Sequence, residues 1–350
     1  MEESPAAGQL RERLAAAGLE LACPLCKGTL GDRGAAFACG PCRREYPVVA
    51  GIPDFRLQPD RFIGLEEDRR KGLRALDLAK GGGFEAALDA YWSITPELAP
   101  DLAVRHHLHQ LRETEIGEQT LREMERLLAA AGDSAPQANG VLLDLGCGTG
   151  GLLAAAGRRF SLVAGVDVAF RWLLVGRLRL REAGVDAALI CANAEYLPFA
   201  PARAGCVTAN DLLEHVADPA AVLAECRRVT ASGGHCYLST NNRYSLAPEP
   251  HVQVWGVGFL ARGLQARYVQ AARGHSYRNL GLLSGTELRR FAERAGLACG
   301  GIEPAPLFAR HLGGSLERLA GVYNSVRLTP LLRPFLGLVG PRVQAVCRPR

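Results

Sequence analysis

The spacing of hydrophobic positions along the chain changes near residue 140. After that point, short apolar runs alternate with helical stretches. The five apolar runs are VLLDLG (141–146), LVAGVDV (162–168), AALICANA (187–194), AGCVTAND (204–211) and GHCYLSTNN (234–242). Short strands that alternate with helices are typical of a parallel sheet. The pattern therefore predicts an α/β fold for this part of the chain.

Before residue 140 the residues mostly favour helix. A short helix is predicted at 1–20, and helices with breaks at KGGGF and ITPELAPD are predicted from Leu65 to Leu128. The segment SAPQANG, at 134–140, has the composition of a linker. These features divide the chain into an N-terminal helix at 1–20, a cysteine module at 21–58, a helical region at 59–135 and a main domain at 136–350.

Two segments interrupt the alternation of strands and helices in the main domain. The first, at about 243–283, is rich in aromatic residues, Arg and Gly, and the capped helix SGTELRRFAERAGL follows it. The second, at about 307–340, is mostly helical. Its stretch VRLTPLLRPFLGLVG fits either a core segment or a short helix on a membrane surface. A closing strand, VQAVCRP, is predicted after it.

Length and composition exclude several classes of protein. With 350 residues, of which 48% are hydrophobic, the chain can form one sizeable core and a small additional module. No apolar run reaches the length of about eighteen residues that a membrane span needs. The first residues, MEESPAAGQLRERLAAAG, are charged and lack the hydrophobic region of a signal peptide. We therefore expect a cytoplasmic protein.

The formal net charge of +5 is unevenly distributed. Residues 243–350 hold 15 Arg and 5 Glu, whereas residues 1–242 hold 26 Lys and Arg against 31 Asp and Glu. A basic excess of this kind attracts nucleic acid, phosphorylated substrates or an anionic membrane surface. It also follows from composition, because the chain uses Arg in preference to Lys throughout. Both explanations stay open at this point.

Four of the eleven cysteines form two identical pairs, Cys23-x2-Cys26 and Cys39-x2-Cys42, with twelve residues between them. Two such pairs can place four thiolates tetrahedrally around a zinc ion. Redox-active pairs and iron–sulfur ligation are alternatives, but matched pairs in a module with almost no core favour a structural zinc ion. The other seven cysteines are scattered singly and predict reduced thiols rather than a disulfide framework.

The segment VLLDLGCGTGG combines a strand, a glycine-rich turn and the start of a helix, which brings backbone N–H groups close to a ligand. Gly146, Gly148 and Gly151 satisfy the spacing of a dinucleotide-binding loop. Gly146, Gly148 and Gly150 satisfy the tighter spacing that S-adenosylmethionine (SAM) sites use. The glycines alone therefore leave the choice of ligand open.

Two carboxylates flank this turn. Asp144 precedes the first glycine by two residues, where its charge repels a pyrophosphate but attracts the ammonium and sulfonium groups of SAM. Asp167 ends the next strand, where a carboxylate can accept hydrogen bonds from ribose hydroxyls. Because NAD and SAM both contain ribose, only Asp144 favours SAM.

Later segments add further motifs in a fixed order. From Val141 to about Ser245 the chain resembles the class I SAM-dependent methyltransferases, particularly those of ubiquinone and menaquinone biosynthesis. The matching motifs are LDLGCGTG, GVDV, NAEYLPF, LLEHVADP and SGGHCYLSTNN. The resemblance implies a Rossmann-like sheet with helical insertions, and SAM as the methyl donor.

The resemblance also implies roles for individual residues. Gly146, Gly148 and Gly150 would pass close to the methionine part of SAM, and Asp167 would bind the ribose. Asn193 and Ala194 would face the adenine. The family commonly has Asp at the position of Asn193, whose amide oxygen can still accept from the exocyclic amine. Asn210 would lie beside the methyl group, although it also suits a turn.

The cysteine module resembles a different family. Together with REYPVVAGIPDF it is similar to the small zinc-ribbon proteins that activate tRNA, rRNA and release-factor methyltransferases as separate partners. The resemblance covers about one tenth of the chain. It implies a fused activator that packs on its own methyltransferase domain or reaches toward the substrate.

The choice of methyl acceptor depends on which groups could handle a proton. His215, in LLEHV, and His251, in APEPHVQVWGVGF, are candidate bases, and structural roles fit both. The Asn/Asp-Pro-Pro-aromatic motif of base amino-group methylation is missing after the fourth strand. Cys206 and Cys236 lie inside predicted strands, as core residues would, which argues against C5-methylation of pyrimidines.

Two classes of acceptor remain. One is a small molecule or glycan that receives a methyl group on O or N, enclosed by the aromatic residues of the first insertion, Trp255, Phe259, Tyr268 and Tyr277. The other is tRNA or rRNA, held by the zinc ribbon and the basic C-terminal third. The missing nucleic-acid motif and the aromatic insertion favour the small acceptor.

Overall fold

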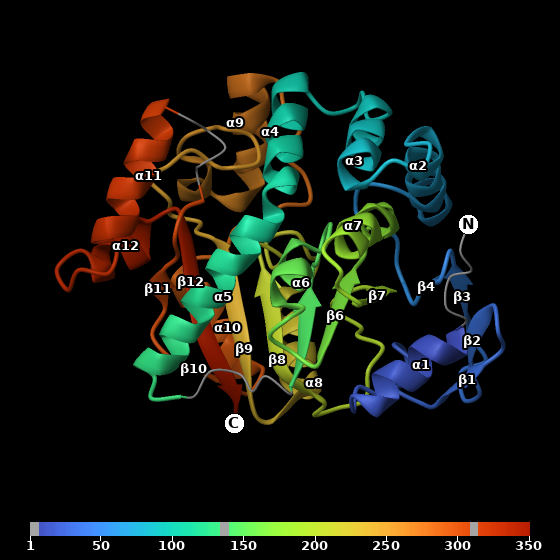
Figure 1. Ribbon diagram of the computed structural model, residues 1–350. Helices are drawn as coiled ribbons and strands as arrows, with labels where there is room; N and C mark the ends of the chain where they lie inside the picture. Colours follow the sequence, from blue (N-terminus) through green and yellow to red (C-terminus); the bar gives the residue numbers. More distant parts are fainter. Residues whose placement is uncertain (1–6, 134–139, 309–313) are drawn as a thin grey trace. The chain divides into compact units, whose positions relative to one another are not determined.

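The computed structural model describes residues 7–133, 140–308 and 314–350 (Figure 1). It divides into two units: unit 1 comprises residues 1–208, 225–236 and 349, and unit 2 comprises residues 209–224, 237–348 and 350. Strands β8 (Ala204–Asn210) and β9 (Thr230–Asn241) and helix α8 (Pro219–Val229) have residues in both units. Except for Gly140, the expected linker at 134–140 lies outside the described residues.

The parallel strands of unit 1 confirm the expected α/β fold. They are β5 (Val141–Leu145), β6 (Leu162–Asp167) and β7 (Ala188–Cys191). Strands β5 and β6 pair in parallel with Val141 beside Leu162, and β6 and β7 pair in parallel with Ala164 beside Ala188. All residues of β5 and β7 are buried, as continuous apolar runs predict for strands covered on both faces. The connections carry α6 (Gly151–Ala156) and α7 (Phe170–Glu182).

Between the cysteine module and this sheet the described chain has four helices, with breaks where KGGGF and ITPELAPD predicted them. They are α2 (Leu65–Leu78), α3 (Phe84–Ser93), α4 (Pro100–Leu111) and α5 (Glu113–Ala130). Figure 1 shows α2 and α3 beside α7, while α5 packs on α6. The crossing points need glycine: a Cβ on Gly72 would lie 2.8 Å from the Cα of Arg171, and one on Gly117 would lie 2.7 Å from the Cα of Leu152.

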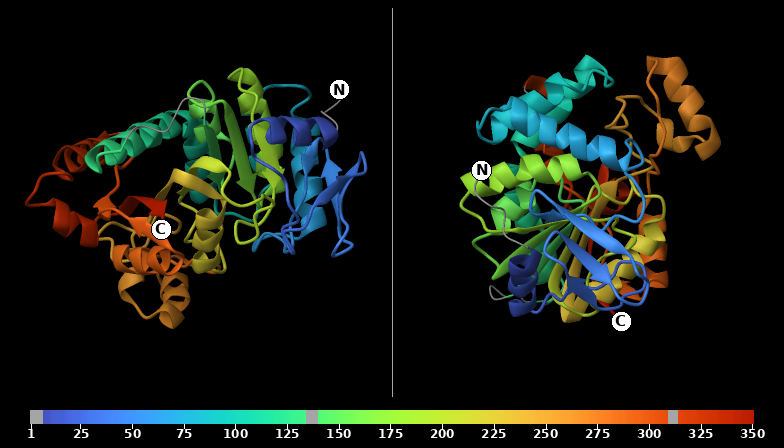
Figure 2. Two further views of the ribbon diagram at one scale, coloured as in Figure 1. Left: turned by 90° about the horizontal axis from the view of Figure 1, so that it is seen from below. Right: turned by 90° about the vertical axis from the view of Figure 1, so that its right-hand side faces the viewer.

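The cysteine module forms a small antiparallel sheet of its own (Figure 2). Its elements are α1 (Ala7–Ala16), β1 (Leu30–Asp32), β2 (Ala36–Cys39), β3 (Glu45–Val49) and β4 (Ile52–Pro53), with strand order β1-β2-β3-β4. The residues between the two cysteine pairs form the hairpin β1–β2, with Leu30 opposite Cys39. Its core is aromatic. The ring centroid of Phe55 lies 5.4 Å from that of Phe37 and 5.1 Å from that of Tyr46.

Unit 2 contains both insertions and the closing strand. Its further elements are η1 (Val257–Phe259), α9 (Arg262–Arg273), α10 (Gly285–Arg294), β10 (Leu297–Cys299), β11 (Glu303–Pro304), α11 (Gly314–Val326), α12 (Arg333–Val339) and β12 (Arg342–Pro349). Ser284 and Glu287 form the capping box at the start of α10 that SGTE predicted. Residues 309–313 of the second insertion lie outside the described residues.

The main sheet is mixed. Its strand order is β10-β12-β9-β8-β5-β6-β7, and β11 pairs antiparallel with β12. In the part of the chain that the structure describes, no helix has both the length and the apolar character needed to cross a membrane.

One prediction about the cysteines is wrong. Cys299 of β10 and Cys347 of β12 form a disulfide, whereas the sequence predicted reduced thiols outside the front group. The two strands are neighbours in the sheet, which brings the two side chains together, and the singly spaced cysteines gave no sign of this pairing. Cys206 and Cys236 are fully buried, as predicted.

Candidate functional site

The glycine turn after β5 has the backbone geometry of a ligand-binding loop. Gly146, Gly148 and Gly150 have φ angles of 72°, 52° and 76°, in the left-handed region that residues with a Cβ rarely adopt. The N–H of Gly146 donates to Val166 O at 2.8 Å, and the N–H of Gly148 donates to the carboxylate of Asp167 at 2.8 Å. The loop is therefore fixed to the end of β6.

Three carboxylates gather at this loop. Asp144 accepts a hydrogen bond from Thr208 Oγ1 at 2.7 Å, and Glu113 accepts one from Thr149 Oγ1. Burial, strengthened by the charges of Asp167 and Glu113, raises the pKa of Asp144 to about 7. Burial also raises the pKa of Asp167 to about 6, although two backbone N–H groups donate to it. Such a group of carboxylates suits a cationic ligand.

Glu113 was not predicted from the sequence. It begins α5, 36 residues before Thr149, and nothing in its local sequence points to the loop. The close contact becomes visible only in the fold: a Cβ on Gly151 would lie 2.3 Å from the Cβ of Glu113. The glycine at position 151 thus serves helix packing rather than the spacing of a dinucleotide loop.

Asn193 and Ala194 follow β7 and are almost completely buried, as residues lining a pocket would be. The amide oxygen of Asn193 accepts from the backbone N–H groups of Leu57 and Gln58, at 2.9 and 3.1 Å. Its amide nitrogen donates to Gln58 O at 3.2 Å. Asn193 therefore holds the segment that follows the ribbon.

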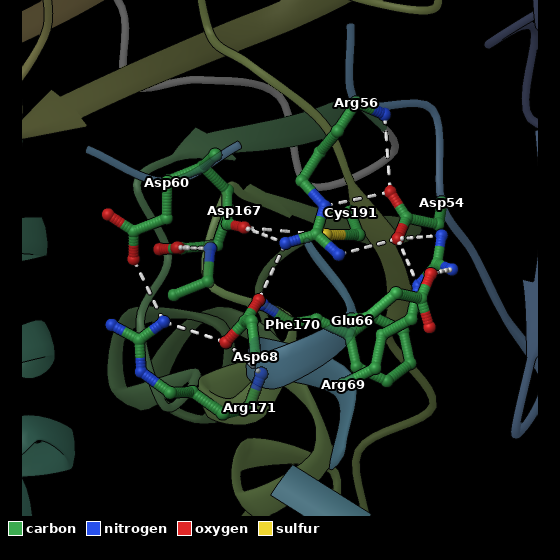
Figure 3. A network of polar contacts seen from close by, with 12 residues as sticks. Asp54, Arg56, Asp60, Glu66, Asp68, Arg69, Asp167, Phe170, Arg171 and Cys191 are labelled. Atoms are coloured by element: carbon green, nitrogen blue, oxygen red, sulfur yellow. Dashed lines mark hydrogen bonds and ion pairs between the residues drawn. The ribbon is translucent and has the colours of Figure 1, made fainter. Parts of the chain in front are cut away.

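The same segment is held by a buried ionic network (Figure 3). The guanidinium of Arg56 pairs with Asp54 and with Asp68, each at 2.6 Å, and all three side chains are at most 1% exposed. Asp68 also accepts from the N–H of Phe170 at 2.8 Å. Arg56 donates to Val168 O at 3.0 Å. The network therefore ties the ribbon to the loop that follows Asp167.

The four front cysteines come together as predicted. Their sulfur atoms lie within 4.8 Å of one another, with Cys23 and Cys42 at 3.6 Å and Cys26 and Cys39 at 3.4 Å. Sulfurs at the corners of a tetrahedral zinc site lie roughly 3.8 Å apart. A Cβ on Gly28 would lie 3.0 Å from the side chain of Pro41 and 3.3 Å from the sulfur of Cys26, so a larger residue would crowd the cluster. The cluster fits a structural zinc ion.

The two candidate histidines also come together, in unit 2. His251 Nε2 lies 3.2 Å from His215 Nε2, and His251 Nδ1 is hydrogen-bonded to Glu249. Glu249 was not predicted from the sequence, although it lies only two residues before His251. Asn210 is engaged elsewhere: its side-chain oxygen accepts from Ser239 Oγ at 3.0 Å.

Comparison with known proteins agrees with this reading of residues 143–238, which match the family model of a methyltransferase domain. A ubiquinone biosynthesis O-methyltransferase of Serratia proteamaculans is 33% identical over 165 residues, which are 47% of this chain and 61% of that protein. The Thiobacillus denitrificans enzyme of the same name is 37% identical over 166 residues, 47% of this chain and 66% of that protein. The chain thus spans less than two thirds of these relatives.

Solved structures with a similar arrangement include geranyl diphosphate C-methyltransferase from Streptomyces coelicolor A3(2). The TM-score is 0.43 at 18% identity, covering 74% of this chain and 86% of that one. The match of residues 143–238 to the methyltransferase family model agrees with the sequence motifs.

Proposed function

We propose that this chain, with its methyltransferase domain at 143–238, transfers a methyl group from SAM to an oxygen or nitrogen atom of a small-molecule or glycan-type acceptor. The observation that carries the proposal is the glycine turn fixed to Asp167 within a group of carboxylates. SAM has an ammonium and a sulfonium group, so carboxylates attract it, whereas they repel the pyrophosphate of a dinucleotide.

The residues present fit SAM. Gly146, Gly148 and Gly150 carry no side chains, which leaves room for the methionine part of SAM. Asp144 precedes Gly146 by two residues, and its carboxylate would attract the ammonium group of SAM. Asp167 has lone pairs left for ribose hydroxyls beyond the two N–H groups it already accepts. Bound SAM supplies a methyl group on a positively charged sulfur.

The adenine end needs a different assignment from the one that the family resemblance implies. Ala194 is buried and would line the adenine pocket directly. Asn193 would act through Leu57 and Gln58, whose backbone it holds, because its amide oxygen already accepts two N–H groups. The protein's own contribution to methyl transfer is then alignment and exclusion of water.

Two observations support a small acceptor. The relatives described above are named O-methyltransferases of ubiquinone biosynthesis. The first insertion also presents exposed aromatic side chains, Trp255, Phe259 and Tyr268, next to a buried cluster that contains Tyr277. Such side chains provide flat apolar surfaces for an aromatic or lipophilic molecule. We assign His215 and His251 to the positioning of the acceptor.

RNA is the second candidate acceptor. It is favoured by the exposed arginines Arg267, Arg273 and Arg278 on and after α9. Two further arginines of this region, Arg243 and Arg262, already pair with the carboxylate of Glu287. A carboxylate that neutralises arginines weakens a phosphate-binding surface.

A labelling experiment tests the proposed function. Full-length protein is incubated with methyl-tritiated SAM and either a small-molecule extract, a glycan fraction or total RNA, each at two salt concentrations. Label in the small-molecule or glycan fraction, with no salt dependence of RNA binding, is the expected result. Salt-sensitive labelling of RNA would move the assignment to the second candidate. No label in any fraction would contradict methyl transfer itself.

A further inference from the structure

Two imidazoles and two buried carboxylates meet in unit 2, among residues that SAM binding does not use. His215 lies in the turn after β8, and His251 lies in the insertion after β9. Their Nε2 atoms face each other at 3.2 Å, with ring planes at 85°. A carboxylate oxygen of Glu214 completes the group, and the three ligand atoms lie within 4.8 Å of one another.

The hydrogen bond to Glu249 determines which ring nitrogen of neutral His251 carries the proton. An ionised carboxylate only accepts, so Nδ1 of His251 must donate to Glu249. Glu249 is itself fixed, because its other oxygen accepts from the N–H groups of His251 and Val252, both at 2.9 Å. In the neutral ring, Nε2 of His251 then carries a lone pair. A metal-bound histidine is typically held in this way by a carboxylate on its second nitrogen.

The cluster holds two buried carboxylates, and the positive groups near them are His251 in its protonated form and, further away, the guanidinium of Arg342. Glu214 is 0% exposed and Glu249 is 4% exposed. Among the residues that the structure describes, neither carboxylate forms an ion pair with a lysine or arginine. Buried carboxylates are costly unless a positive charge lies close to them.

The distances fit one ion. Metal–nitrogen bonds of about 2.0–2.1 Å place two nitrogens on one ion roughly 2.8–3.0 Å apart in octahedral geometry and roughly 3.3–3.4 Å apart in tetrahedral geometry. The observed 3.2 Å lies between these two ranges. The third ligand is also oriented: Glu214 accepts from Thr240 Oγ1 at 2.8 Å and from Asn241 Nδ2 at 2.6 Å. Ligating carboxylates are usually held by such hydrogen bonds.

We propose that Glu214, His215 and His251 bind a divalent transition-metal ion, in a second metal site besides the four cysteines of the ribbon. Two imidazoles and one carboxylate suit zinc, cobalt or manganese better than magnesium or calcium. Three protein ligands leave at least one position open, and an oxygen atom of water or of a small ligand occupies it.

The hydroxyl of Tyr277 is a further polar group near these charges. It is buried and has no hydrogen-bond partner among the described residues. Burial, together with the charges of Glu249 and Glu214, raises its pKa.

Cobalt binding to the full-length, zinc-loaded protein tests the proposal. We expect one additional equivalent of Co²⁺, with the weak visible bands of a nitrogen and oxygen site and no thiolate-to-metal charge-transfer band. His251→Asn and Glu214→Gln should abolish this equivalent. Glu249→Gln should weaken cobalt binding about 10- to 100-fold, because the carboxylate of Glu249 no longer orients the ring of His251. His275→Asn, which removes a histidine outside the cluster, should bind like wild type.

The results that overturn the proposal are equally direct. Wild-type protein that takes up no Co²⁺, Mn²⁺ or Zn²⁺ beyond the ribbon zinc would contradict it. So would a His251→Asn protein that binds cobalt as tightly as wild type. The zinc content of the ribbon and the thermal unfolding curve show which variants are folded. If His251→Asn or Glu214→Gln does not fold, cobalt binding is measured on His215→Asn instead. Neither readout depends on the methyl acceptor or on SAM.

Discussion

The backbone N–H of Gly148 donates a 2.8 Å hydrogen bond to the carboxylate of Asp167. This contact joins the glycine turn after β5 to the end of β6. The two features that a SAM site needs, a loop free of side chains and a carboxylate for the ribose, therefore form one rigid corner of the sheet. Changes to Asp167 should affect binding of SAM both directly and through the loop.

Asp167→Asn should weaken the binding of SAM and of its demethylated product. The variant loses a charged acceptor that also fixes Gly148, and such hydrogen bonds contribute about 1.5–3 kcal/mol, or roughly a 10- to 100-fold change in Kd. Isothermal titration calorimetry measures the change. Asp186→Asn is the matched control, since the side chain of Asp186 is 78% exposed. Equal affinities for wild type and Asp167→Asn would remove Asp167 from the site.

The pH dependence of SAM binding follows from the two raised carboxyl pKa values. In the free protein Asp144 has a pKa of about 7 and Asp167 of about 6, so both are partly protonated in slightly acidic solution. A cationic ligand prefers the ionised carboxylates and lowers their pKa values. SAM binding should therefore release protons below about pH 7, and affinity should rise with pH until both groups are ionised.

Calorimetry in buffers with different ionisation enthalpies measures this proton release. We expect release near pH 6.5 to exceed that near pH 8.5, by an amount below about two protons per site, one for each carboxyl group. Asp144→Asn should lose the larger part, because Asp144 has the higher pKa. Proton uptake on binding, or an affinity that falls as pH rises, would show that the pocket does not hold a cation.

Cys39→Ser should lose the ribbon zinc and destabilise the N-terminal module. Three thiolates bind zinc far less tightly than four, and the module has little core besides Phe37, Tyr46 and Phe55. Metal analysis of fresh protein kept under reductant should find one zinc at the four cysteines in wild type and none there in the variant. Cys206→Ser, at a buried cysteine outside the module, should keep its ribbon zinc. A zinc-free wild-type protein would exclude the site.

Arg56→Met should destabilise the fold strongly. It leaves two buried carboxylates, Asp54 and Asp68, without one of their cationic partners. Removing one partner of a buried ion pair costs about 3–5 kcal/mol, whereas an exposed pair contributes about 1 kcal/mol or less. Urea unfolding should show the difference against Arg33→Met, whose partner Glu45 is exposed. Similar unfolding midpoints would mean that the network contributes little.

Local sequence signals predicted much of the fold. All five apolar runs became strands β5 to β9, and the SGTE sequence became the capping box of Ser284 and Glu287. The spacing of the cysteine pairs predicted their cluster. These features depend on residues that lie close together in the chain, where periodicity, spacing and capping patterns are informative.

Long-range contacts were not predictable in the same way. Glu113 reaches Thr149 only through the packing of α5 on α6, and Asn193 reaches Leu57 only because the ribbon segment lies beside β7. Strand β10 is too short to show periodicity, so its pairing with β12 and the disulfide between Cys299 and Cys347 were missed. Each of these contacts depends on tertiary structure, which single-sequence patterns do not contain.

The central claim is that the pocket around Gly148 and Asp167 binds SAM. Calorimetric titration of the full-length protein with SAM, with its demethylated product and with NAD tests this claim most directly. We predict micromolar-scale binding, about −8 kcal/mol, for SAM and its product and no binding of NAD. Binding of NAD together with no binding of SAM would contradict the account and restore the dinucleotide interpretation of the glycine loop.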